Sequence, residues 1–293
     1  MFRNGQTAGK RKNRTKENTL GRVAGAVVTY GTMLFVLIIS VYPLLWIFIS
    51  SFKSRMDIMD SPLKIPTRLF FDGYKAVFTS APIATYFKNS IIVASFSTLM
   101  NIMLVAMAAY VVARFEFRMK NAVVAMFAST LFIPGIAISY PLFVMIRAVG
   151  LYNTKTGLTL TYAGLGIALT FFILRSYITS IPKEMDEAAL IDGAGYLRIF
   201  LQFIVPLARP GIATAAILTF LFNWNDFFFA LLLTGGDQSR TLPVVIFNFN
   251  SQFRGNLGAL FASIVVIVTP TILIYSIASE QVVKSLMEGG VKA

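Results

Sequence analysis

Long runs of residues without charge dominate this sequence and leave few folds open to it. Five intervals carry no charged residue and a sixth carries only Asp226: 23–52, 89–113, 121–146, 156–174, 255–279 and 210–236. Each comes close to or exceeds the roughly 20 apolar residues that cross a hydrocarbon core about 30 Å thick. A buried helix of a soluble protein would show polar residues at a 3.6-residue period, and these intervals show none. The runs predict an all-α membrane protein with six transmembrane helices, at about 24–50, 87–113, 121–146, 156–178, 211–233 and 259–279.

The positions of the basic residues predict how the chain is oriented. Six spans place both termini on one side of the membrane, and Lys and Arg concentrate on the cytoplasmic side. The external loop 51–86 is basic too, but the balance favours cytoplasmic termini. We therefore expect a basic cytoplasmic tail over 1–20, a membrane domain over 21–286 and a cytoplasmic tail over 280–293. Because the net charge of +13 serves orientation, nucleic acid is not expected as a partner. The orienting residues are Arg3, Lys10, Arg11, Lys12, Arg14, Lys16, Arg22, Arg114, Arg118 and Lys120.

Prolines and glycines predict where the spans bend or approach one another. A proline inside a membrane helix frees a carbonyl group and permits a bend, which we expect at Pro134-Gly135 and at Pro141 in the third span. The fourth span carries three glycines as close-approach points, namely Gly157, Gly164 and Gly166. The loop 51–86 is long and aromatic, which favours a folded cap.

Missing residue types exclude several chemistries. The chain has no cysteine and no histidine, which excludes disulfides, cysteine or histidine metal sites and histidine-based catalysis. No phosphate-binding loop occurs in the sequence, so the chain is not expected to hydrolyse a nucleotide. Any energy for active transport must then come from a partner or an ion gradient. A membrane enzyme is disfavoured because paired intramembrane carboxylates are also missing.

The polar segment 182–210 lies between the fourth and fifth spans and is expected in the cytoplasm. Ser180 can cap a helix that begins near Pro182, and Glu184, Asp186 and Glu187 would then lie at the positive end of its dipole. This helix would present Ala188 and Ala189, whose side chains are small enough to enter a groove on another protein.

Two glycines predict a turn after this helix. Gly193 and Gly195 lie where a helix can end, and a second helix from Tyr196 leads back toward the membrane. A helix that only rests on lipid is normally basic, whereas the first helix here is acidic. The segment is therefore predicted to bind another protein.

At these residues the sequence resembles the membrane subunits of ATP-binding-cassette importers. Their cytoplasmic loop has the pattern E-A-A, three residues, G, nine residues, I-x-L-P, and Glu187-Ala188-Ala189, Gly193 and Pro206 fall in register with it. Phe203 and Val205 replace the isoleucine and leucine. The resemblance is closest to the carbohydrate branch, and within it to the shorter permease of maltose-type importers. Further matches are Asp192-Gly193-Ala194, Phe200, Pro141-Leu142-Phe143, Gly150-Leu151-Tyr152-Asn153-Thr154, Trp224-Asn225 and the ending 289–292.

The resemblance implies a type I importer permease fold in a bacterial or archaeal cytoplasmic membrane. Its segment 182–210 would be the coupling helix that seats on a cytoplasmic ATPase, with docking residues Glu187, Ala188, Ala189, Asp192, Gly193, Ala194 and Phe200. The implied partners are a second homologous permease, two ATPase subunits, an external solute-binding protein and membrane lipid. ATP and Mg would bind the ATPase, and this chain would hold no cofactor. The external loop before the last span would contact the binding protein through Gly235, Gly236 and Thr241.

A polar and aromatic group in the membrane domain is the candidate substrate pathway. Aromatic faces and amides suit a sugar but suit helix packing equally, and the substrate can be held either here or by the partner permease. Asp226 is a departure from the glutamate usual in the family. An ionisable residue inside a span is a functional candidate by default, unless it lies at the wetted interface. The alternative function is a stand-alone secondary transporter or channel that uses Asp226 for ion coupling. The candidate pathway residues are Tyr140, Asn223, Trp224, Asn225 and Asp226.

Overall fold

The computed structural model describes residues 6–247 and 256–290, with side chains for 25–247 and 256–276. Parts of the predicted tails (1–5 and 291–293) and of the external loop (248–255) lie outside these residues. In chain order the elements are α1 (Gln6–Ser50), α2 (Arg55–Asp60), α3 (Asp72–Ser80), α4 (Ile83–Arg114), α5 (Lys120–Thr130), η1 (Gly135–Ile138), α6 (Ser139–Ala148), α7 (Lys155–Leu165), α8 (Ile167–Ser180), α9 (Glu184–Ile191), α10 (Tyr196–Ile199), η2 (Phe200–Ile204), α11 (Val205–Leu207), α12 (Arg209–Asn225), α13 (Phe228–Leu233), η3 (Leu242–Val244) and α15 (Leu257–Gly290).

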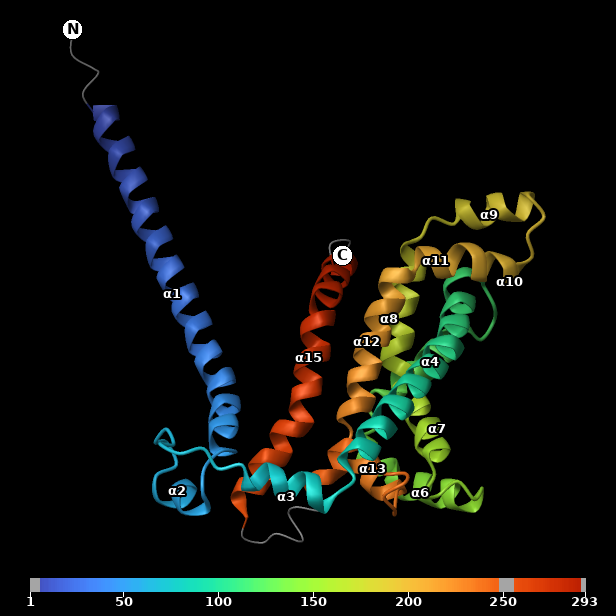
Figure 1. The fold of residues 1–293 in the computed structure, drawn as a ribbon. Helices are drawn as coiled ribbons and strands as arrows, with labels where there is room; N and C mark the ends of the chain where they lie inside the picture. Colours follow the sequence, from blue (N-terminus) through green and yellow to red (C-terminus); the bar gives the residue numbers. More distant parts are fainter. Residues whose placement is uncertain (1–5, 248–255, 291–293) are drawn as a thin grey trace.

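The helices form an elongated bundle with two different ends. Helices α4, α8, α12 and α15 run along it, and α9 to α11 lie across one end (Figure 1). The N-terminal part of α1 and the C-terminal part of α15 point to that same end, whereas α2, α3, α6 and α13 lie at the other (Figure 1). The all-α architecture predicted from the uncharged runs is confirmed.

Three of the predicted spans are continuous helices in the described part of the chain. Gly25–Ser50 of α1, the whole of α4 and Leu257–Ser276 of α15 are each long and apolar enough to cross a membrane. Two boundaries differ from the prediction. Helix α1 already begins at Gln6, so residues 6–20 are helical rather than a separate tail, and α15 continues through residue 290.

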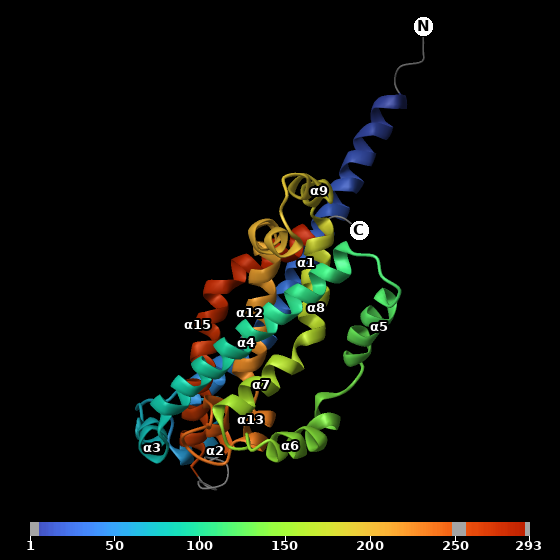
Figure 2. The same cartoon turned by 90° about the vertical axis from the view of Figure 1, so that its right-hand side faces the viewer.

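The third span is broken rather than kinked. Helix α5 ends at Thr130, the backbone is extended at Pro134 (φ −60°, ψ 130°), and η1 with α6 continues at 98° to α5. Figure 2 shows α5 along the side of the bundle and α6 across its end. The bend expected at Pro134-Gly135 is present, but it is larger than a proline kink because the helix stops before the proline.

The fourth span is bent by 50° between α7 and α8, at Gly166. Asn101 of α4 donates from Nδ2 to the carbonyl of Ala163 at 2.8 Å, so a side chain satisfies a backbone group near the bend. A Cβ at Gly157 would lie 2.3 Å from the Leu151 carbonyl oxygen, and one at Gly166 would meet Thr219 at 3.5 Å. The structure thus places Gly157 and Gly166 at close approaches. Gly164 has open space beside it, so that part of the prediction is wrong.

The fifth span also differs from the single helix expected over 211–233. Helix α12 ends at Asn225, and the chain is extended at Asp226 before α13 begins at Phe228. At its other end α12 turns by 77° from the segment Tyr196–Leu207, which lies across the end of the bundle (Figure 1). Seventeen residues rise about 26 Å, so α12 accounts for most of the crossing.

Helix α4 is the centre of the packing, with buried residues along its full length. Its C-terminal half packs with α8 and the segment after α9 in one apolar core. Its N-terminal half packs with α3, α12 and α15 in a second core, and with α6, α7 and α13 in a third. Each core therefore contains a part of α4, which makes this helix the common support of both ends of the molecule.

The loop 51–86 forms the folded cap that its length and aromatics predicted. The Phe52 ring lies 5.5 Å from the Phe71 ring and 5.2 Å from the Tyr74 ring. Lys53 is only 3% exposed, and its Nζ donates to the carbonyl of Pro62 at 2.7 Å. The buried lysine is satisfied by backbone oxygens, so it fixes the loop against the end of α1.

Candidate functional site

The segment predicted to bind a partner forms a layer across one end of the bundle (Figure 1). It consists of α9, a glycine turn, α10, the wider helical turn η2 and α11. The η2 segment is π-helical. π-Helical turns are rare in proteins, and those that occur are often located at functional sites. The predicted pair of short helices is therefore present.

The turn after α9 depends on Gly193. Its φ of +79° lies in the left-handed region that favours glycine. The Gly193 N–H donates to the Leu190 carbonyl at 3.0 Å and the Ala194 N–H to the Ala189 carbonyl at 2.9 Å, which is the Schellman pattern of a helix end. The structure confirms Gly193 as the turn, whereas Gly195 is extended (φ −73°) and could be another residue.

The start of α9 is not where the sequence predicted. Ser180 does not cap it: its hydroxyl donates to the Tyr177 carbonyl at 2.8 Å, at the end of α8. Helix α9 begins at Glu184, after Lys183 at the N-cap position, which makes no side-chain cap bond. The three acids still lie in the first turn of α9, so the dipole argument holds with a later start.

The seven predicted docking residues divide by exposure. Glu187, Ala188, Asp192 and Gly193 are exposed on the outer side of the segment. Ala189, Ala194 and Phe200 are 4%, 8% and 7% exposed and belong to the core shared with α4. The expectation that Ala189 is presented to a partner is therefore not met, because its small side chain lets α9 pack on the chain itself. The docking role of the exposed residues stays a prediction.

Sequence reasoning missed the role of Arg114, which it counted only as an orienting charge. Arg114 is the last residue of α4, and its side chain is 4% exposed. Its Nε lies 2.8 Å from Oδ2 of Asp186 on α9, and its Nη1 donates to the Ile181 carbonyl at 2.9 Å. Burial raises the pKa of Asp186, and the Arg114 guanidinium opposes this rise without cancelling it. Arg114 and Asp186 are 72 residues apart, and no sequence pattern indicates that the end of α4 packs against α9, so the ion pair could not be predicted.

At the opposite end of the bundle, Asn153 organises the predicted binding-protein contact. Asn153 has φ +58°, and its Oδ1 accepts from the N–H groups of Gly235 (2.8 Å) and Gly236 (3.0 Å) and from the Ser239 hydroxyl. Gly235 is exposed and Gly236 half-buried. Thr241 is 3% exposed, so a surface contact through it is not available in this structure.

The five predicted pathway residues do not gather on one surface. Tyr140 on α6 is 75% exposed and Asn225 at the end of α12 is exposed. Asn223 and Trp224 are buried: Asn223 Nδ2 donates to Ser97 Oγ at 2.9 Å, and the Trp224 ring packs against Phe87. These two residues serve helix packing, the alternative that the sequence left open.

Asp226 caps a helix. Its Oδ1 accepts from the Tyr162 hydroxyl at 2.7 Å and from the N–H groups of Phe229 and Ala230 at 3.0 and 3.2 Å. These bonds satisfy donors at the start of α13, as a helix N-cap does. The carboxylate is therefore used by the chain's own backbone and by one buried tyrosine.

A cavity of about 590 Å³ lies between α4, α5, α7 and the start of α8, and its wall is almost wholly apolar. None of the five predicted pathway residues lines it, although Phe222 and Phe229 beside them do. Thr130 is the one lining residue with a polar side chain, and its hydroxyl donates to the Phe127 carbonyl at 2.8 Å. The cavity therefore does not offer the array of polar groups that a sugar would need.

The long apolar helices of the bundle define the class of protein, a multi-pass membrane protein. Residues 101–287 match the family described as binding-protein-dependent transport system inner membrane component, and the chain belongs to this family. It is 37% identical to the diacetylchitobiose uptake system permease NgcG of Streptomyces coelicolor, over 90% of this chain and 88% of that protein. It is 38% identical to the trehalose transport system permease SugB of Mycobacterium tuberculosis, over 90% of this chain and 97% of that one.

A solved structure has the same fold. The crystal structure of a bacterial ABC transporter involved in import of the acidic polysaccharide alginate superposes with a TM-score of 0.75 at 22% identity, covering 88% of this chain and 96% of that chain. The likeness extends over most of the chain, so the two chains share their overall fold.

Proposed function

We propose that this chain is the membrane-spanning permease subunit of an ATP-driven importer. An external solute-binding protein delivers a sugar or oligosaccharide, and a separate cytoplasmic ATPase, which holds ATP and Mg, drives its passage. This chain holds no cofactor. The relatives support a carbohydrate, because their names specify diacetylchitobiose, trehalose and, for a Thermococcus litoralis permease 32% identical to this chain, trehalose or maltose.

The observation that carries this proposal is the division of the segment 182–210 into an outer and an inner face. Its outer face is acidic and exposed, and its inner face packs into a core with α4. Solvated, rigidly supported acids at a helix start suit a protein partner. A lipid surface would favour basic residues.

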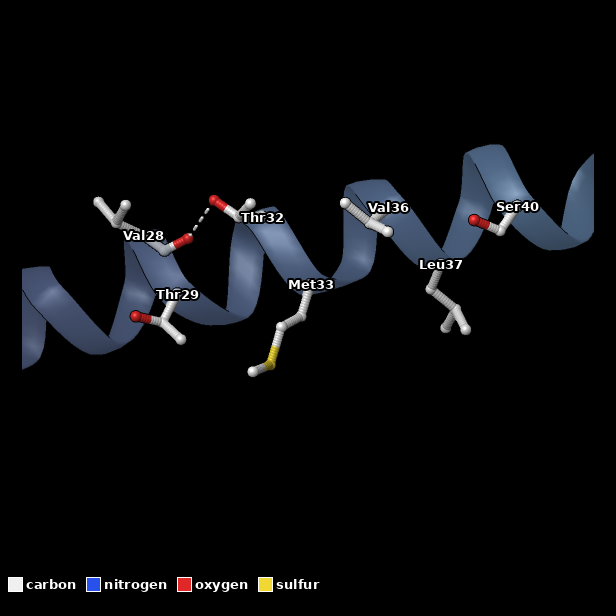
Figure 3. Close-up of a pocket in the computed structure, with 7 residues that line it drawn as sticks. All are labelled: Val28, Thr29, Thr32, Met33, Val36, Leu37 and Ser40. Carbon is white, nitrogen blue, oxygen red and sulfur yellow. Dashed lines mark hydrogen bonds between the residues drawn. The ribbon is translucent and has the colours of Figure 1, made fainter. Parts of the chain in front are cut away.

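Helix α1 supports a second permease as a further partner. Its residues 25–45 are exposed on all sides, and α1 stands apart from the bundle (Figure 1). Figure 3 shows Thr29, Thr32 and Ser40 on one face, where the Thr32 hydroxyl donates to the Val28 carbonyl at 2.8 Å. Hydroxyl-bearing residues of this kind are enriched where membrane helices pack closely, so lipid alone is a poorer match for this face.

The proposed orientation places both termini and α9 in the cytoplasm and the cap 51–86 outside. The absence of native cysteine makes a direct test simple, because each introduced cysteine is the only thiol. Ile191→Cys on α9 (87% exposed) and Ile65→Cys in the cap (74% exposed) report the two sides. In right-side-out vesicles, an impermeant maleimide should label Ile65→Cys alone. Labelling of Ile191→Cys alone would reverse the orientation.

The function is tested by uptake into proteoliposomes that contain this chain, its partner permease, the ATPase and the binding protein. Wild type should take up sugar only with ATP. Glu187→Arg should weaken binding of the ATPase and lower uptake, whereas membrane insertion is unchanged. Glu116→Arg is the charge-matched control, since Glu116 is also an exposed acid, lies on the α4–α5 link at the same end and pairs with Lys120 at the start of α5. Normal ATP-dependent uptake by Glu187→Arg would contradict the docking role, and ion-driven uptake by the chain alone would contradict the function.

A further inference from the structure

One guanidinium group connects three elements at the end of the bundle where α9 lies. Arg114 ends α4, its Nε is paired with Asp186 of α9, and its Nη1 bonds to Ile181 in the link between α8 and α9. Arginine can hold the ion pair with Asp186 and the hydrogen bond to Ile181 at once because its planar guanidinium presents N–H groups in different directions, which a lysine ammonium cannot reproduce. The contact is thus a joint between α4 and the beginning of the docking segment.

An aromatic ring lies beside this joint. Tyr110 is near enough to interact with both Asp186 and Arg114, it packs 5.2 Å from Phe200, and the Asp186 side chain is 15% exposed. The other charged groups acting on Asp186 are Glu187 and Lys183 of its own segment, with Tyr110 beside it.

Desolvation of a buried ion pair can cost as much as its attraction returns. Burial raises the pKa of Asp186 even though Arg114 lies beside it, so the charged state is not favoured by its surroundings. A net gain in stability is therefore a poor explanation for the pair. What the pair does provide is a fixed orientation of α9 relative to α4.

The other end of α4 makes a comparable set of bonds to the external loop. The Tyr86 hydroxyl donates to Asp237, Asn89 Nδ2 donates to the carbonyls of Gln238 and Arg240 at 2.9 Å each, and Ser90 Oγ accepts from the Leu242 N–H at 2.8 Å. Between these bonds and Arg114, α4 is an unbroken helix of 32 residues, about 48 Å long. Its neighbours α5–α6, α7–α8 and α11–α12 are all bent.

We propose that Arg114 is a positioning residue for transport: it clamps α9 to α4, so that α9, α4 and the external loop 237–242 move as one body. The inference rests on the proposed function, in which α9 is the docking helix of the ATPase. The clamp transmits the movement of α9 to the side where the binding protein arrives. Coupling between two sites typically changes a binding affinity by about 5- to 150-fold, and this range sets the scale of the effect expected here.

The test compares Arg114→Gln with Arg118→Gln, which removes an exposed arginine from the α4–α5 link at the same end. In the reconstituted importer, Arg114→Gln should still bind the ATPase and hydrolyse ATP, but import about tenfold less sugar per ATP. Arg118→Gln should match wild type. Asp186→Asn combined with Arg114→Gln should be no worse than Arg114→Gln alone, because both changes break one joint.

A distance measurement separates this role from a merely structural one. Spin labels at Ile191→Cys on α9 and Gln238→Cys in the external loop should keep a constant separation between nucleotide-free and nucleotide-trapped states in wild type. In Arg114→Gln the separation should change between the states, and Arg114→Lys should show an intermediate change if Arg114→Gln does not fold.

Two results overturn the clamp. The first is that folded Arg114→Gln imports as much sugar per ATP hydrolysed as wild type. The second is that Arg114→Gln loses transport only because it no longer binds the ATPase. Failure of wild type to import sugar with ATP would instead overturn the proposed function, so the two failures are distinguishable.

Discussion

Asp226 separates two explanations of an acid inside a membrane span. If the carboxylate couples an ion to transport, its charge is required. If it caps α13, only its acceptor atom is required. Asp226→Asn keeps an oxygen that can accept from Tyr162, Phe229 and Ala230, whereas Asp226→Ala removes it. The pair of variants therefore tests charge and capping separately.

The structure sets the expected size of the effect. Loss of an N-cap costs about 1 kcal/mol. The Tyr162 side chain is fully buried, and leaving its hydroxyl without its 2.7 Å partner costs about 1–3 kcal/mol more. Asp226→Ala should thus lose about 2–4 kcal/mol of folding free energy, towards the lower value because polar contacts in membrane proteins measure small. Asp226→Asn should lose less than about 1 kcal/mol.

The assay is the folded fraction that remains after heating in mild detergent, followed by size exclusion, together with ATP-dependent uptake. We expect Asp226→Asn to melt near wild type and to transport, and Asp226→Ala to melt clearly lower. Loss of uptake by a folded Asp226→Asn would show that the charge is needed. Equal melting of the two variants would show that the capping bonds carry little energy.

Three further predictions concern the docking segment and its support. Gly193→Ala should destabilise the α9 turn by about 1–2 kcal/mol because φ is +79°, and Gly195→Ala, at φ −73°, should not; equal ATPase binding by both variants would refute this. Gly211→Ala places a Cβ 2.4 Å from the Tyr177 ring, so it should destabilise the fold by about 1–3 kcal/mol and lower the melting temperature. The double variant Gly211→Ala/Tyr177→Ala should recover part of this loss, and no recovery would show that Gly211→Ala clashes with another group. Because burial raises the pKa of Asp186, the folded state binds a proton more readily than the unfolded state. The free energy of unfolding should therefore increase as the pH falls through the raised pKa towards the ordinary value. Asp186→Asn should remove this contribution, and identical curves of stability against pH for wild type and Asp186→Asn would contradict the pKa shift.

The lengths of the uncharged runs and the positions of the prolines predicted the membrane fold, because few backbone folds are possible in lipid. The three continuous spans, the folded cap and the turn at Gly193 follow from composition, aromatic content and backbone freedom, all of which are local. The break before Pro134 was underestimated because a proline residue specifies where a helix stops but not the angle at which the chain resumes. That angle depends on packing against distant helices.

The candidate sites were predicted less well, because burial is decided by contacts between distant parts of the chain. Ala189 and Ala188 are neighbours of one type, yet one is buried under α10 and the other is exposed. Trp224 and Asn223 read as sugar-binding residues, but the side chains of α4 hold them inside the bundle. Arg114 read as a surface charge, although its partner on α9 buries it.

One physical reason explains the positions of Asn101, Asp226 and Arg114. Where a helix of a membrane protein ends or breaks, it frees backbone groups that must form hydrogen bonds within the protein. Asn101 reaches the freed carbonyl of Ala163 between α7 and α8, Asp226 reaches the freed N–H groups of α13, and Arg114 reaches the Ile181 carbonyl after α8. These three side chains are thereby committed to the chain's own backbone. Of the predicted pathway residues, Tyr140 and Asn225 remain exposed, and the Asn225 amide is already bonded to the Leu221 carbonyl and the Thr271 hydroxyl.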